Sequence, residues 1–433
     1  MLAEGAGAHG LMWWASVVVS AASLRALVFG GTGFRSAPTV EYLVASGYDV
    51  VTVSRGNEYW AILDRLAAVG AKRWTCNRTL AAPGKGGLAD CSKLQTEEFF
   101  DAVIDFSSRS EGEIEQAISL LRDRVGVYIF ISSHLVYEVS VEQAAPQREH
   151  YARRLGREVS PMDRYALKGR NEIGDALLEC EEALYKQYSV GGFPYVVLRT
   201  ANLFGPEENT FRYWLLHLWV RAHRSLGLPL HLQQNLTDVP LSMTYTHDIG
   251  TAVLAVLRKH ENVNCCPEDV HAQTFNIASD QPLDQYAFFM MIADQLDVLK
   301  VEAQILENKS VQLYPENTRG HVSVEKALKT LQWSPKSLPN ALRATGMWYD
   351  RVMVAGKFAK QRKTMYTKLR NMIKKDGKRF MNWVEDYYET AKKEGTYVEF
   401  DDDEEEQIWT VQVQAETKKG KIKKRSPNPR DEM

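Results

Sequence analysis

The sequence predicts an α/β protein with a doubly wound parallel sheet, because short apolar strands alternate along the chain with helices. Five such strands are expected, at 24–31, 48–54, 100–107, 125–133 and 194–200. Helical stretches lie between them, such as 37–47, 111–122 and 168–188. Strands this apolar are buried on both faces, as in a parallel sheet that helices cover on each side.

The composition is that of a globular protein with a sizeable core. Apolar residues make up 45% of the 433 residues and charged residues 25%, an ordinary balance for such proteins. The net charge of -2 excludes a globally basic nucleic-acid binder, although it says nothing against a local basic patch.

Cysteine usage and the N-terminal residues bear on the compartment. The five cysteines include no CxxC pair, which argues against a disulfide framework and against a zinc site. The apolar run 11–22 has no Lys or Arg before it and is shorter than the ~20 residues that span a bilayer. We therefore expect reduced thiols, no metal, no integral membrane span and a cytoplasmic location; secretion and organelle import stay open.

A glycine cluster joins the first strand to the first helix, in the order Gly30, Gly31, Thr32, Gly33 and Phe34. Only glycine lets the backbone turn tightly there and approach a pyrophosphate, while the helix N-terminus offers free N–H groups. A plain strand–helix turn does not need three glycines in four residues. The cluster therefore predicts a dinucleotide-binding loop of Rossmann type.

This loop resembles that of the extended short-chain dehydrogenase/reductase family, also called the NAD-dependent epimerase/dehydratase family. The family loop reads GGTGFIG and this chain has GGTGFRS, so Arg35 replaces an apolar residue and Ser36 the third glycine. Arg35 faces either the cofactor phosphates or solvent. Over residues 24–345 further segments match in the family's order: FISSHLVYE, RTANLFGPEE, YTHDIGTAVLAVL, TFNIAS and VEKALKTLQWSPK.

The resemblance over 24–345 and the charged composition of the remaining C-terminal residues divide the chain into three regions. Residues 24–205 would form the Rossmann dinucleotide-binding domain, to which 241–262 return. Residues 206–350 would mainly form a smaller substrate-binding region for a nucleotide sugar or another small molecule. Residues 351–433 would be a charged tail, helical or disordered.

The end of the second strand predicts the cofactor. An acidic residue at this position binds the ribose of NAD, whereas an arginine pairs with the 2′-phosphate of NADP. Here Ser54 and Arg55 occupy it without an acid, which favours NADP over NAD; an Arg that only begins a loop is the alternative. Asp90 resembles the family aspartate that meets the adenine ring.

The resemblance also implies a catalytic serine, tyrosine and lysine. Ser133, next to Ser132, matches the serine that hydrogen-bonds the substrate oxygen. Tyr165 matches the proton donor, and Lys168 the lysine that lowers the tyrosine pKa and holds the nicotinamide ribose. The family spacing is YxxxK, so Lys168 comes one residue early. It would sit ~60° to one side of Tyr165 on a helix, instead of ~40° to the other, and we expect intact cofactor binding with weak or specialised turnover.

Two other functions stay open beside the enzyme. One is a cofactor-binding regulatory protein with little turnover. The other is RNA binding, because the short RG after the second strand resembles the chloroplast stem-loop RNA-binding branch of the family. Segment 357–379 carries ten Lys or Arg against one Asp. It is expected to form an amphipathic helix. Either its charged face binds RNA or an anionic membrane surface, or it docks on the main domain through its apolar residues, Phe358, Met365, Leu369 and Met372.

Two further features have alternative interpretations. Family members often dimerise through a four-helix interface, and the 168–188 helix is the candidate for a homodimer. The aromatic stretch with Trp214, His217 and Trp219 either lines the substrate pocket or packs a helix.

Overall fold

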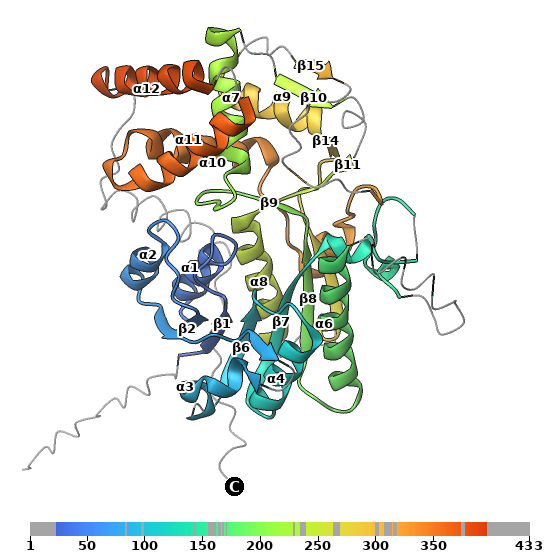
Figure 1. The fold of residues 1–433 in the computed structure, drawn as a ribbon. Coiled ribbons are helices and arrows are strands. Elements are labelled where there is room, and N and C mark those ends of the chain that lie inside the picture. The colour runs from blue at the N-terminus through green and yellow to red at the C-terminus, as the bar shows by residue number, and fades with distance from the viewer. Residues whose placement is uncertain are drawn as a thin grey trace, which may run out of the picture.

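The chain folds around a parallel sheet, and the predicted doubly wound α/β fold is confirmed. The structure is a computed structural model. It describes residues 23–82, 85–96, 99–141, 144–154, 162, 166, 169, 171–227, 230–233, 240–262, 269–298, 303–306, 314, 318–373 and 377–395. Within them seven parallel strands lie in the order β13-β8-β7-β6-β1-β2-β3 (Figure 1). Their bounds are β1 Arg25–Phe29, β2 Asp49–Ser54, β3 Lys72–Thr75, β6 Phe100–Asp105, β7 Val125–Ser133, β8 Tyr195–Thr200 and β13 Gln273–Ile277.

The central strands contribute alternate side chains to two separate hydrophobic cores. On β1, Ala26 and Val28 belong to one core, and Leu27 and Phe29 to the other. Helices α1 Ala37–Ala45 and α8 Thr246–Glu261 cover the first face. Helices α4 Glu111–Leu121 and α6 Glu172–Ser189 cover the second. Burial on both faces explains why these strands are nearly continuous apolar runs.

The strand order reverses beside β1. Strand β1 pairs with β2 on one side and with β6 on the other. The chain runs from β1 outward through β2 to β3 and then returns to the opposite side of β1 as β6. Ligands of open parallel sheets bind outside the carboxyl ends of the strands at such a reversal. The fold therefore places a candidate site above the end of β1.

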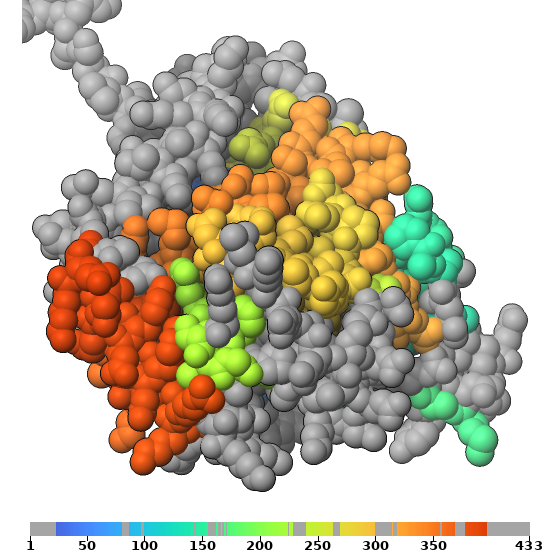
Figure 2. Space-filling view, turned by 90° about the horizontal axis from the view of Figure 1, so that it is seen from above, coloured from blue at the N-terminus to red at the C-terminus, as the bar shows by residue number. Residues whose placement is uncertain are grey.

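A second lobe of helices lies over the carboxyl ends of the strands (Figure 1). Its helices are α7 Arg212–Leu226, α9 Gln285–Gln295, α10 Leu338–Val354, α11 Ala359–Ile373 and α12 Gly377–Lys393. Helix α7 packs against α9, α10 and α12, and α11 packs against α12 (Figure 2). No helix in the described part of the chain has the length and apolar character needed to cross a membrane.

Short elements connect these layers. The remaining helices are α2 Ile62–Ala68 and α3 Ser92–Thr96, with helical turns η1 Gly87–Asp90, η2 His134–Tyr137, η3 Glu149–Tyr151, η6 Ala327–Leu331 and η7 Gly356–Phe358. Two-stranded pairs are β4 Leu80–Ala82 with β5 Lys85–Gly86, β9 Asn202–Phe204 with β12 Met243–Tyr245, β10 Leu230–Gln233 with β15 Ala303–Leu306, and β11 Pro240–Leu241 with β14 Leu283–Asp284.

The basic segment docks on the second lobe. Phe358 and Met365 are buried in the core, as the docking interpretation requires; the side chains of Leu369 and Met372 lie outside the described residues. Lys368 donates a hydrogen bond to the carbonyl oxygen of Thr210. The apolar side of α11 therefore faces protein.

A disulfide joins Cys76, which follows β3, to Cys91, which follows η1, with 5.7 Å between their Cα atoms. The expectation of reduced thiols is wrong for this pair. The two cysteines lie 15 residues apart in sequence, and only the return of the chain from β3 to η1 brings them together. Cys180 is free and buried in α6.

Candidate functional site

A cavity of about 620 Å³ opens along the carboxyl ends of β1, β2, β6, β7 and β8. One end is lined by the glycine loop and by Ser54 and Arg55 at the end of β2. The other end is lined by Ser133, the last residue of β7, and by Arg212 at the start of α7. The cavity therefore lies at the reversal of the strand order and runs from there to the second lobe.

The glycine loop forms the floor of the cavity below the start of α1. Gly30 has a φ of 71°, and a Cβ on it would lie 3.0 Å from the Cβ of Ser107. A Cβ on Gly31 would lie 2.8 Å from the Cγ2 of Thr52, so Gly31 packs on β2 and is not among the residues that line the cavity. Neither position has room for a side chain.

Ser36 ties the glycine loop together. Its hydroxyl donates a hydrogen bond to the Gly30 carbonyl oxygen at 2.7 Å and accepts one from the Gly33 N–H at 3.1 Å. The side chain is buried, so serine fits where the family has its third glycine. Thr32, Gly33, Phe34 and Arg35 line the cavity beside it.

The structure does not bring Asp90 to the cavity. Asp90 ends the helical turn η1, which packs against α4, and it is exposed. Instead Asn77, Arg78 and Thr79 line the cavity, because they directly follow β3. Sequence reasoning missed these residues because β3 is a short, exposed edge strand without an apolar run.

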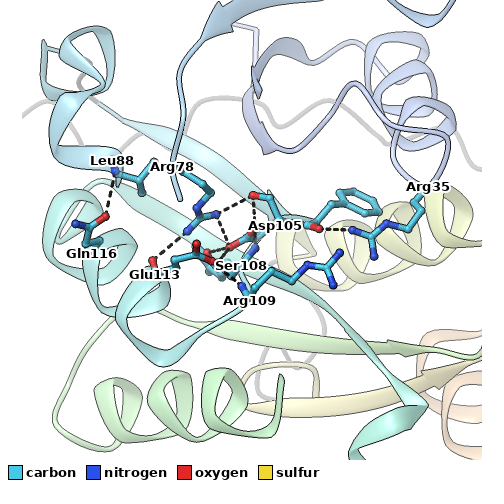
Figure 3. A network of polar contacts seen from close by, with 11 residues as sticks. Arg35, Arg78, Leu88, Asp105, Ser108, Arg109, Glu113 and Gln116 are labelled. Atoms are coloured by element: carbon cyan, nitrogen blue, oxygen red, sulfur yellow. Dashed lines mark hydrogen bonds and ion pairs between the residues drawn. The ribbon is translucent and has the colours of Figure 1, made fainter. Parts of the chain in front are cut away.

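Below the cavity, Arg78 and Asp105 form a buried ion pair (Figure 3). Arg78 Nη1 lies 2.8 Å from Asp105 Oδ2, and the guanidinium lies over the Phe29 ring. The backbone N–H groups of Ser107 and Ser108 donate to Asp105 Oδ1 at 2.8 and 3.0 Å. Burial by itself raises the pKa of Asp105, but Arg78 and the hydrogen bonds outweigh it and hold the pKa below its usual range. Asp105 is therefore a carboxylate at neutral pH.

The charge on the cavity wall is positive. Among the described residues that line it are five arginines and no aspartate or glutamate; the arginines are Arg35, Arg55, Arg78, Arg109 and Arg212. Arg78 pairs with Asp105, and Arg212 with Glu208. Within the described residues no carboxylate lies within ion-pair distance of the other three. Unneutralised guanidinium groups in a concave site favour a ligand with several negative charges.

The strand β7 brings Ser132, Ser133 and His134 to the cavity. Ser132 is engaged below it, because its hydroxyl donates to the buried carboxylate of Glu181 at 2.6 Å. Ser133 accepts a hydrogen bond from the Leu135 N–H at 3.3 Å and begins the turn η2. Tyr165 and Lys168 lie outside the described residues.

The aromatic stretch of α7 packs the second lobe. Trp214, His217 and Trp219 are buried, and none of the three is among the described residues that line the cavity. His217 lies 2.8 Å from the carboxylate of Asp350, which also accepts from Tyr388 at 2.7 Å. The packing interpretation therefore applies to this stretch.

The loop after β2 is anchored in the second lobe by Trp60. This side chain is 7% exposed and lies among five aromatic rings, those of Phe211, Trp214, Trp348, Tyr349 and Phe358. Arg65 of α2 pairs with both Glu41 of α1 and Glu207, which follows β9. Arg55 thus lies in a loop whose end is fixed by the second lobe.

Solved structures with a similar fold are nucleotide-sugar epimerases and dehydratases. The UDP-glucuronic acid 4-epimerase of Bacillus cereus, in complex with UDP-glucuronic acid and NAD, is 19% identical with a TM-score of 0.55, covering 76% of this chain and 100% of that chain. The dTDP-glucose 4,6-dehydratase of Bacillus anthracis, in complex with NAD, is 16% identical with a TM-score of 0.56, covering 76% and 97%. The UDP-glucose 4-epimerase of Thermotoga maritima, with UDP-glucose, is 18% identical with a TM-score of 0.53, covering 76% and 100%.

No protein-family model matches the sequence, and no curated protein matches it either. At such low identity the similarity concerns the fold. The chain therefore has the fold that these epimerases and dehydratases share, as its resemblance to the extended short-chain dehydrogenases predicted.

Proposed function

We propose that the chain is an NADP(H)-binding enzyme that acts on a nucleotide sugar or a related small molecule as an oxidoreductase, epimerase or dehydratase. The observation that carries this proposal is the cavity itself, where a glycine loop, five arginines and Ser133 line one continuous space. The similar structures from Bacillus cereus and Bacillus anthracis hold NAD, which supports a nicotinamide dinucleotide in general. The cofactor would supply or accept a hydride when bound.

Cofactor binding and substrate binding would be assigned to different parts of the chain. Residues 24–205, with 241–262, would bind the dinucleotide, and 206–350 would mainly bind the substrate. The pyrophosphate would lie at the glycine loop, on the N-terminal side of α1, where free N–H groups and the helix dipole favour an anion. Binding of RNA through 357–379 and a homodimer through α6 stay predictions, and the cytoplasm stays the expected compartment.

NADP is preferred over NAD in this proposal because the end of β2 offers a hydroxyl and a cation, but no acid. Ser54 and Arg55 line the cavity there, and Arg55 is exposed without a carboxylate partner among the described residues. An aspartate would repel the 2′-phosphate and accept hydrogen bonds from the ribose hydroxyls instead.

Arg55→Asp is therefore expected to weaken NADPH binding by about ten- to a hundredfold, the worth of one charge-assisted hydrogen bond, and to leave or improve NADH binding. Fluorescence titration with both dinucleotides measures this. Arg73→Asp, on the exposed face of β3, controls for a general change of charge. Tighter binding of NADH than of NADPH by the unchanged protein would refute the preference for NADP.

The catalytic part of the proposal assigns a role to each of three residues. Ser133 would hydrogen-bond the reacting oxygen of the substrate, since its side chain lines the cavity. Tyr165 would give or take the proton at that oxygen, and the Lys168 ammonium would lower its pKa. The spacing between Tyr165 and Lys168 is one residue shorter than in the family, which changes where the ammonium lies relative to the phenol. A misplacement of ~1 Å can cost ~100-fold in rate.

Tyr165→Phe is expected to lower any epimerase or reductase activity by roughly 100-fold or more, because it removes the general acid, while NADPH affinity stays nearly unchanged. Activity is measured with UDP-glucuronic acid, UDP-glucose and dTDP-glucose. Tyr185→Phe, at an exposed position of α6, is the matched control. A fully active Tyr165→Phe protein would show that another group carries the proton.

One inserted residue after Leu167 restores the family spacing and is expected to leave the activity equal or higher. If the unchanged protein is highly active and the insertion abolishes this activity, the short spacing is an adaptation of the catalytic site. Tight NADPH binding with no turnover on any of the three substrates would favour the regulatory alternative.

A further inference from the structure

Arg35 reaches across the end of β1 toward β6. Its Nη2 donates a hydrogen bond to the carbonyl oxygen of Phe106 at 2.6 Å, directly after β6 (Figure 3). A guanidinium carries five N–H donors, and no other hydrogen bond from this side chain to the described residues is present. Arg35 also lines the cavity, so its remaining donors are available to a ligand.

Arg109 approaches Arg35 from the loop between β6 and α4. Its backbone N–H is held by Glu113 Oε2 at 2.7 Å, while its guanidinium extends toward that of Arg35 (Figure 3). Burial and the Arg109 charge lower the pKa of Arg35 to about 10, and Asp105 offsets only part of this. Two neighbouring cations without a carboxylate at ion-pair distance among the described residues indicate the place of an anion.

One backbone N–H group of the glycine loop, near Arg35, already donates a hydrogen bond within the protein. The Gly33 N–H is taken by the Ser36 hydroxyl, so it is not directed at a ligand. The chain thus combines a serine at the third glycine position with an arginine just before it. Guanidinium donors take the place of a backbone N–H group in this arrangement.

We propose that Arg35 and Arg109 form a two-arginine clamp that holds the pyrophosphate of the bound dinucleotide. The inference rests on the proposed function and deepens it. Arg35 adjoins the glycine loop, whereas Arg55 and Arg212 lie at the two opposite ends of the cavity. The clamp therefore binds a group that NAD and NADP share, and Arg55 binds the group that distinguishes them.

The test separates these two roles with four probes: NADPH, NADH, 2′-AMP, which has no pyrophosphate, and UDP. Arg35→Ile, which restores the family residue type, and Arg109→Leu are each expected to weaken NADPH and NADH by the same factor, about ten- to a hundredfold. Binding of 2′-AMP should not change. Arg55→Asp should give the opposite pattern, with losses for NADPH and 2′-AMP only.

Arg73→Leu, at an exposed residue of β3 that does not line the cavity, is the matched control, and the melting temperature of each variant verifies folding. Arg35→Lys keeps a charge without the planar fork and should recover part of the affinity. Unchanged affinity of Arg35→Ile and Arg109→Leu for both dinucleotides would overturn the clamp. A loss of UDP binding alone would also overturn it, since the pair would then serve the substrate. Failure of the unchanged protein to bind either dinucleotide would instead refute the proposed function.

Discussion

Asp105→Asn is expected to lower the free energy of unfolding by about 3 to 5 kcal/mol, the cost of breaking a buried ion pair. The side chain is fully buried. The substitution leaves the Arg78 guanidinium charged and buried without its counter-ion. The asparagine NH₂ group cannot accept hydrogen bonds, yet it would face groups that donate to the Asp105 carboxylate. One of these is the Tyr128 hydroxyl, 2.5 Å from Asp105 Oδ2. Urea denaturation followed by tryptophan fluorescence measures the loss.

A matched control is Asp49→Asn, which removes an exposed ion pair with Lys72 on the same sheet and should cost ~1 kcal/mol or less. In the double variant Asp105→Asn, Arg78→Met, part of the stability should return, because no unpaired charge stays buried. Equal stability of Asp105→Asn and Asp49→Asn would show that the pair contributes nothing. Since the Asp105 pKa is lowered, its contribution is complete at neutral pH and is lost only as acid protonates it. The variant should therefore lose less stability on acidification than the unchanged protein.

Trp60→Ala is expected to cost a similar amount, about 3 to 5 kcal/mol, because it leaves a cavity among five aromatic side chains. The ring closest to Trp60 is that of Trp348, with centroids 5.0 Å apart. The substitution should also weaken NADPH binding, since the loop that carries Arg55 loses its anchor. Calorimetry and dinucleotide titration measure the two effects on one sample.

Tyr286→Ala is the control for this variant, because Tyr286 of α9 is 41% exposed and is not among the residues that line the cavity, so it should change stability by ~0.5 kcal/mol or less. A loss of stability without any change in NADPH affinity would mean that Arg55 does not depend on the anchor. Unchanged stability of Trp60→Ala would show that the lobes are held together elsewhere.

The parts of the fold that could be predicted are those with a local pattern. The five apolar strands and the glycine loop are each visible within ten residues of sequence, and all appear in the structure. Strand β3 has no such pattern, because it is an exposed edge strand. For that reason Asn77 and Arg78, which follow it, were missed. Asp90 was expected at the adenine ring from a resemblance of its segment to the family, and the structure leaves it outside the cavity.

Features that join distant segments could not be predicted. The sequence around Cys76 and Cys91 does not indicate that they pair, because their proximity depends on the return of the chain after β3. Arg109 lies in a loop that reads as ordinary polar sequence, and only the fold places it opposite Arg35 (Figure 3). The predicted tyrosine and lysine await the measurements above, because they lie outside the described residues.

The anchoring of Trp60 and Arg65 has a consequence for the order of events during synthesis. The strands around β1 are made early, and local or neighbouring pairings can form as the chain emerges. Three of the five rings around Trp60, those of Trp348, Tyr349 and Phe358, belong to α10 and η7 late in the sequence, and contacts of such long separation form late. The loop with Arg55 can take up its final position only after α10 has left the ribosome. We therefore expect a nascent chain to bind a dinucleotide tightly only when its last helices are complete.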